Sequence, residues 1–123
     1  QDKDLDTNIS PDDTSIFNIL NSSNHLLSDV IRGSNSLGSL FETYGFSALP
    51  SSLSPSPEGM RYFSGGYNTV VYGRDSDYNF NAIQLEFPYP TIRDNQNSIN
   101  KFAEAFSSIV HDYFIAYFNI DLF

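Results

Sequence analysis

Gln84 and Glu86, two positions apart, are the residues of this sequence best placed to do chemistry. They lie in the stretch NAIQLEF, residues 81–87, whose alternating apolar residues predict a β-strand. Because side chains alternate along a strand, Gln84 and Glu86 share one face, while Ile83 and Leu85 share the opposite face and are expected to meet the core. A carboxylate held rigidly beside a cleft can act as a general base, although a glutamate that only faces water gives the same pattern.

A glycine pair marks a second candidate region, in the stretch FSGGYN. Gly65 and Gly66 permit positive φ angles and a close approach of the backbone to a ligand, and Tyr67 could direct its phenol into the same site. A plain turn followed by a core tyrosine would look identical. Arg74, a few residues later, is a possible anchor for a substrate carboxylate, as any surface arginine would be.

The sequence contains no residue pattern typical of a metal site or of a catalytic nucleophile. It has no cysteine, and neither of its two histidines, His25 and His111, has a second ligand three or four residues away of the kind that a zinc-binding helix shows. No Gly-x-Ser-x-Gly motif is present. We therefore expect no metal site made from this chain alone and no serine nucleophile.

The charge balance excludes several classes of partner. The formal net charge is −9, so we expect no binding to nucleic acid or to an anionic membrane surface. No apolar run is long enough to span a bilayer, and the first ten residues, which lack an initiating Met, do not form a signal peptide. Either a processed start or an arbitrary boundary explains the missing Met, and two glycosylation patterns, at Asn8 and Asn21, lead us to expect a secreted or extracellular protein.

The predicted elements form an α/β pattern. Apolar spacing, caps and breakers predict helices at about 12–31, 35–45 and 94–118, with NSSN at 21–24 dividing the first into two. The last helix carries an apolar stripe, formed by Ile99, Phe102, Ala103, Phe106, Ile109, Val110, Tyr113, Phe114 and Tyr117. Stretches rich in β-branched and aromatic residues predict strands at about 67–72 and 81–87. We expect residues 1–13 to form an acidic, flexible arm and residues 14–123 to belong to one domain. Two strands make a marginal sheet, so we expect another chain to complete it.

One long stretch carries a family resemblance. It runs IRGSNSLGSLFETYGFSALPSSLSPSPEGMRYFSGGYNTVVYG and is followed by NAIQLEFP and a closing amphipathic helix. Residues 30–118 thereby resemble the C-terminal half of the N-formylglutamate amidohydrolase family, in particular its secreted-type relatives. The most specific marks are residues 63–67, Tyr72-Gly73 and residues 82–86.

The resemblance implies the C-terminal part of a mixed-sheet fold similar to that of zinc carboxypeptidases. It implies that Glu86 is the general acid/base of an amide hydrolysis, that Gln84 shapes the pocket, and that Gly65, Gly66 and Tyr67 form a pocket wall. The zinc-binding motifs of the family belong to its N-terminal half and have no counterpart here, and Asn79 and Asn81 stand where the family often has a histidine.

Three hypotheses follow. In the first, this is the C-terminal chain of a two-chain amidohydrolase, and the N-terminal half of the same precursor supplies zinc and acts with it on an acyl-amino-acid or peptide-like amide. In the second, the chain is a non-catalytic structural or matrix protein that keeps the fold. In the third, it is a free-standing domain that binds a small ligand.

Overall fold

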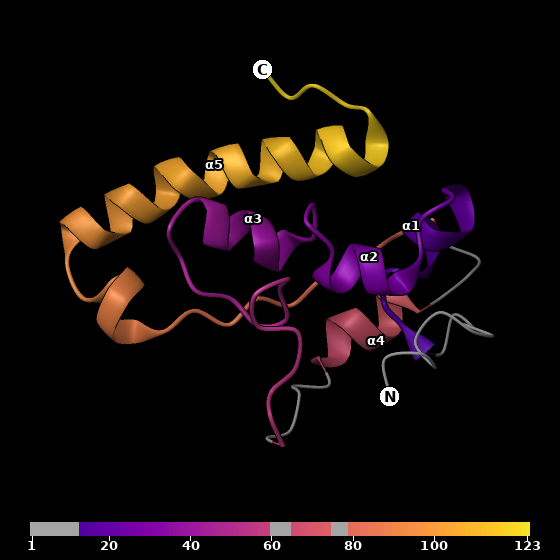
Figure 1. Cartoon of the computed structure of the whole chain (residues 1–123), viewed down its shortest axis with the longest axis horizontal. Coiled ribbons are helices and arrows are strands. Elements are labelled where there is room, and N and C mark those ends of the chain that lie inside the picture. Colours follow the sequence, from indigo (N-terminus) through magenta and orange to yellow (C-terminus); the bar gives the residue numbers. More distant parts are fainter. Residues whose placement is uncertain (1–12, 60–64, 75–78) are drawn as a thin grey trace.

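The computed structural model describes residues 13–59, 65–74 and 79–123, and within these residues the chain is helical, without a β-strand (Figure 1). The elements are α1 (Phe17–Ser22), α2 (Leu27–Arg32), α3 (Leu37–Thr43), α4 (Tyr67–Gly73), the π-helix η3 (Tyr89–Arg93) and α5 (Gln96–Phe118). The expected α/β fold with a mixed sheet is therefore wrong for this part of the chain. The predicted acidic arm lies outside the described residues, except for Asp13.

The predicted C-terminal helix is confirmed as α5, the longest element. It begins at Asn95, whose side-chain oxygen accepts a hydrogen bond from the Ser98 N–H at 3.0 Å. It ends at Asn119, which adopts the left-handed conformation that asparagine tolerates at a helix end. No helix in the described ranges is long and apolar enough to cross a membrane.

The core forms where α5 packs along α3 and where α3 meets α2 (Figure 1). Ile109 and Tyr113 are the buried residues of α5, and the core cluster consists of Ile16, Ile19, Leu27, Val30, Leu40, Phe41, Ile109 and Tyr113. Ile99 and Ala103, which fit the predicted apolar stripe, are exposed. The stripe is thus buried mainly along the C-terminal half of α5.

The first predicted helix, 12–31, is divided as the NSSN stretch indicates. The helices α1 and α2 are separated by residues 23–26, and the Ser23 hydroxyl donates to the Ile19 carbonyl at 2.5 Å near the end of α1. The predicted helix at 35–45 is confirmed as α3, with Ser36 as its N-cap accepting from the Ser39 N–H at 3.2 Å. Local capping chemistry explains both boundaries.

The predicted strand at 67–72 is wrong, because this segment forms α4. Thr69 and Gly73, one helical turn apart, are buried, whereas Val70 and Val71 are exposed. The Thr69 hydroxyl donates to the Gly66 carbonyl at 2.7 Å in the first turn. A helix satisfies its backbone hydrogen bonds internally, so a β-branched segment without a neighbouring strand can adopt one against its propensity.

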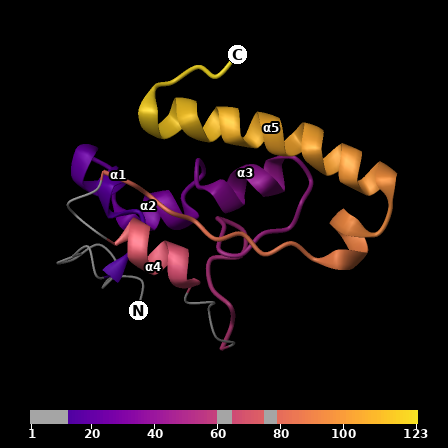
Figure 2. The same cartoon turned by 180° about the vertical axis from the view of Figure 1, so that it is seen from behind.

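The predicted strand at 81–87 is extended but unpaired, and it is therefore not a strand. Ala82 N–H donates to the Ser15 carbonyl at 2.9 Å, and the backbone groups of residues 83–87 have no hydrogen-bond partner in the described part of the chain. Figure 2 shows this segment running between α4 and α5. Phe87 fixes its end, with its ring 4.7 Å from that of Phe102 on α5.

Candidate functional site

A row of hydrogen bonds joins three of the residues singled out by sequence. The Gly66 N–H donates to Oε1 of Gln84 at 2.6 Å, and Nε2 of Gln84 donates to Oε1 of Glu86 at 2.8 Å. Gln84 thereby has its carbonyl end turned to the glycine loop and its amino end turned to the carboxylate. We call Gly66, Gln84 and Glu86 the polar row.

The geometry at both glycines disfavours a side chain. A Cβ atom on Gly66 would lie 2.8 Å from Oε1 of Gln84, so the end of the Gln84 side chain would have to shift. Gly65 has a φ of +78°, a conformation that L-residues with side chains rarely adopt. A side chain at either position would therefore disturb the entry into α4 and the contact with Gln84.

Contacts from α1 and α4 hold the extended segment in place. The Ser15 hydroxyl donates to the Ala82 carbonyl at 2.6 Å, and the Ile19 N–H donates to Oδ1 of Asn81 at 3.0 Å. At the end of α4, Gly73 lies so close to Ser15 and Ala82 that a Cβ atom would clash with both. The polar row therefore rests on a segment fixed at residues 81 and 82.

Two predicted site residues are not part of the polar row. Tyr67 directly follows Gly66, but its side chain is 77% exposed and its hydroxyl makes no hydrogen bond within the described residues. Arg74 follows the last residue of α4, at the opposite end of that helix from Gly66. Its Nε atom is buried without a hydrogen-bond partner in the described part of the chain. The structure thus joins Gly66, Gln84 and Glu86 and separates Arg74 from them.

The polar row is open to solvent. Gln84 and Glu86 are both exposed, and the second carboxylate oxygen of Glu86, Oε2, has no partner among the residues that the structure describes. Hydrogen bonding to Oε1 restricts the rotation of the carboxylate and leaves Oε2 to accept a proton from water or to contact a bound molecule. The row can therefore present one oriented basic oxygen.

The histidines serve local packing. The His25 ring lies 5.0 Å from that of Tyr117, and the His111 ring stacks at 4.9 Å on Phe123. The described residues contain no group of three or more His, Cys, Asp or Glu side chains that could hold a metal ion. They do not by themselves fit the zinc site that the family resemblance implies.

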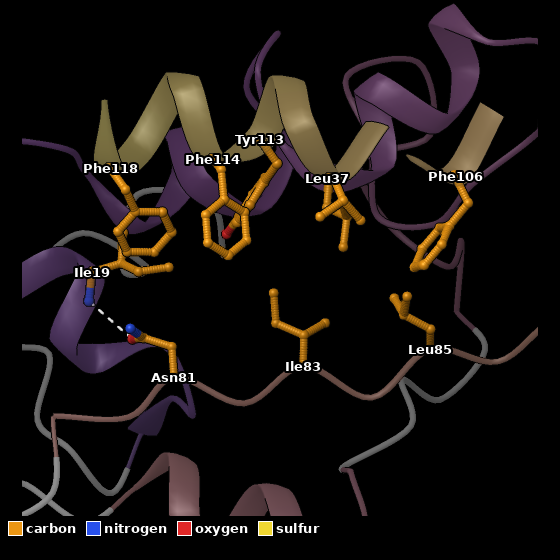
Figure 3. A pocket seen from close by; sticks show the side chains of 10 residues that line it. Ile19, Leu37, Asn81, Ile83, Leu85, Phe106, Tyr113, Phe114 and Phe118 are labelled. Carbon is orange, nitrogen blue, oxygen red and sulfur yellow. Dashed lines mark hydrogen bonds between the residues drawn. The ribbon is translucent and has the colours of Figure 1, made fainter. Parts of the chain in front are cut away.

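A cavity lies on the other side of the extended segment, and the sequence did not reveal it. Ile83 and Leu85 point from this segment toward α5, as the predicted alternation requires, and a space of about 250 Å³ remains between them and the helix (Figure 3). Most of its lining is apolar, with Asn81 and Tyr113 also at the wall. The apolar stripe of α5 predicted that the α5 residues of this wall are buried. No signal in the sequence shows that the space between them and the extended segment is incompletely filled.

Comparison of the chain with protein-family models, with curated proteins and with solved structures gives no match. The resemblance to N-formylglutamate amidohydrolases therefore remains a prediction from the sequence.

Proposed function

We propose that this chain is the C-terminal chain of a two-chain, N-formylglutamate-amidohydrolase-like hydrolase in which Glu86 is the general acid/base. The observation that carries the proposal is the polar row. Gly66 was selected from one motif of the sequence and Gln84 and Glu86 from another, and hydrogen bonds of 2.6 and 2.8 Å join the three. A carboxylate oriented in this way suits proton transfer at a bound amide.

In the proposed reaction, Glu86 accepts a proton from the water that attacks the amide carbonyl carbon. The carboxyl group then donates this proton to the leaving nitrogen as the C–N bond breaks, which returns Glu86 to its carboxylate form and yields an acid and an amine. Gln84 is a positioning residue, because it contacts Oε1 and leaves Oε2 to exchange the proton. The substrate would be an acyl-amino acid or a peptide-like amide.

A second chain, the N-terminal half of the same precursor, has two roles in this proposal. It would cover the exposed face that carries Glu86 and so exclude bulk water from the reaction. It would also hold the zinc ion, which supplies an activated water when bound. Exposed apolar side chains on and beside α4, among them Val70, Tyr72 and Phe80, would suit coverage by such a chain.

The test is a comparison of Glu86→Gln with the native assembly of both chains. Hydrolysis of N-formylglutamate is measured at saturating substrate, together with the zinc content and the mass of the complex. Glutamine keeps the size of the side chain but cannot accept the proton, so we expect kcat to fall about 10²- to 10⁴-fold. Zinc content and assembly should not change.

The matched control is Glu104→Gln, which removes the same charge from an exposed position of α5. It should keep native activity. Full activity of Glu86→Gln would refute the catalytic role, and so would an equal loss in both variants, because the loss would then follow the change in net charge.

The exposure of Gln84 and Glu86 also favours a second function, a non-catalytic structural protein. An acidic chain with exposed tyrosines and valines can associate with other macromolecules without performing a reaction. Native mass spectrometry with zinc analysis separates the two functions. A complex of two different chains with about one zinc supports the hydrolase, and an assembly of this chain alone without zinc supports the structural protein.

A further inference from the structure

The cavity between the extended segment and α5 has an apolar wall on each side. Figure 3 shows Ile83 and Leu85 pointing from the segment toward Phe106 and Phe114 on the helix. Ile83 is 46% exposed, so the cavity opens to solvent beside this residue. This space is open on one side, and its volume of about 250 Å³ leaves room for a benzene-sized molecule, which an enclosed cavity of ~150 Å³ can hold.

Two polar groups line this apolar space, and both can donate a hydrogen bond. Tyr113 is only 6% exposed, and its hydroxyl has no hydrogen-bond partner among the residues that the structure describes. The Oδ1 atom of Asn81 already accepts from the Ile19 N–H at 3.0 Å, which leaves the amino group of Asn81 as a donor. The Tyr113 hydroxyl is not among the sealed, unpartnered polar atoms of the described residues, so it remains accessible and can donate to water or to a bound acceptor.

We propose that this cavity is a binding site for a neutral apolar molecule that carries a carbonyl oxygen, such as a ketone, an ester or a neutral amide. A carbonyl oxygen can accept a hydrogen bond from the Tyr113 hydroxyl, and the Asn81 amino group is a second donor in the same lining. The apolar body of the ligand would replace water against Ile83, Leu85, Phe106 and Phe114.

The electrostatics of the cavity favour a neutral ligand. No charged side chain lines it, and the whole chain carries a net charge of −9. A carboxylate would lose hydration there without gaining a cationic partner. Burial, and secondarily Tyr117, raise the pKa of Tyr113 above its ordinary value, so this phenol keeps its proton at neutral pH.

This site is separate from the polar row. Side chains alternate along residues 81–86, so Ile83 and Leu85 face the cavity while Gln84 and Glu86 lie on the opposite face. Binding in the cavity therefore needs neither Glu86 nor a second chain. Ligand binding in the cavity can therefore be tested without the proposed hydrolase activity.

The experiment measures binding of two probes of matched shape to the purified chain by titration calorimetry. Acetophenone carries a carbonyl group, and α-methylstyrene has a methylene group in its place. Each probe is titrated into the native chain and into Tyr113→Phe, which keeps the ring but removes the hydroxyl. We expect Tyr113→Phe to weaken acetophenone about fivefold, the worth of one hydrogen bond, and to change α-methylstyrene less than about twofold.

A second pair of variants tests the location. Ile83→Trp adds bulk at the opening of the cavity and should weaken both probes at least about tenfold by occupying their space. Ile115→Trp makes the same change at an equally exposed residue of α5 that does not line the cavity, and it should have no effect. Circular dichroism confirms that each variant keeps its helices.

Three results would overturn the inference. The first is that neither probe binds the native chain. The second is that Tyr113→Phe weakens both probes equally or neither of them, because the hydroxyl would then have no role as a donor. The third is that Ile83→Trp and Ile115→Trp bind the probes alike, which would place binding elsewhere.

Discussion

The burial of α5 can be tested at one residue, Ile109, whose exposed fraction is 0%. Ile109→Ala removes three carbon atoms from the core, and each buried methylene contributes about 0.8 kcal/mol to the free energy of unfolding. These losses sum to about 2.4 kcal/mol, and the cavity left behind raises the expected cost to about 3–4 kcal/mol. A loss of this size is a large part of the stability of a small domain, which is on the order of 5–15 kcal/mol.

The assay is urea unfolding followed by far-UV circular dichroism, with Ile115→Ala as the matched control. Ile115 lies on the same helix and is 46% exposed, so its truncation should cost less than about 1 kcal/mol. The midpoint should fall for Ile109→Ala, and the dependence of the free energy on urea should stay the same. Equal losses in the two variants would refute the packing of α5 against α3.

Two further predictions concern α5. Asn95→Ala removes the N-cap that accepts from Ser98 N–H, and it should lower the free energy of urea unfolding by about 1 kcal/mol, whereas Asn95→Asp should stay close to native because it can cap as well. Burial, followed by the charge of Asp29, raises the pKa of Tyr117 to about 12. The unfolded chain therefore loses this proton first, near pH 10, so stability is fully present below pH 10 and falls as the pH rises toward 12. Urea midpoints measured across this range should fall less steeply in Tyr117→Phe, and an unchanged slope would contradict the assignment.

Local signals explain which helices could be predicted. Ser36 and Asn95 are side-chain caps, and the Asn/Ser run after α1 ends that helix, so sequence reasoning found the limits of α3 and α5 within a few residues and the division of the first helix. The apolar stripe of α5 also identified Ile109 and Tyr113 as core residues. These features depend on neighbours in the sequence, which is why the sequence alone was sufficient.

The strand predictions failed for a different physical reason. The pattern at 67–72 describes side chains that suit a pleated surface, but a strand also needs a partner for its backbone groups, and the pattern contains no information about that partner. The segment 81–87 shows the two requirements separately. Its side chains alternate as predicted, while the backbone groups of residues 83–87 remain unpaired within the described chain.

The same alternation explains how one short segment can serve two different environments. Ile83 and Leu85 contribute to an apolar cavity, and Gln84 and Glu86 extend a polar row from Gly66. A shift of one residue would exchange these faces, so the register must be fixed. Hydrogen bonds to Asn81 and Ala82 fix it at one end, and the packing of Phe87 on Phe102 fixes it at the other. The chemistry proposed for each face therefore depends on anchors along the segment, one of which, Asn81, also lines the cavity.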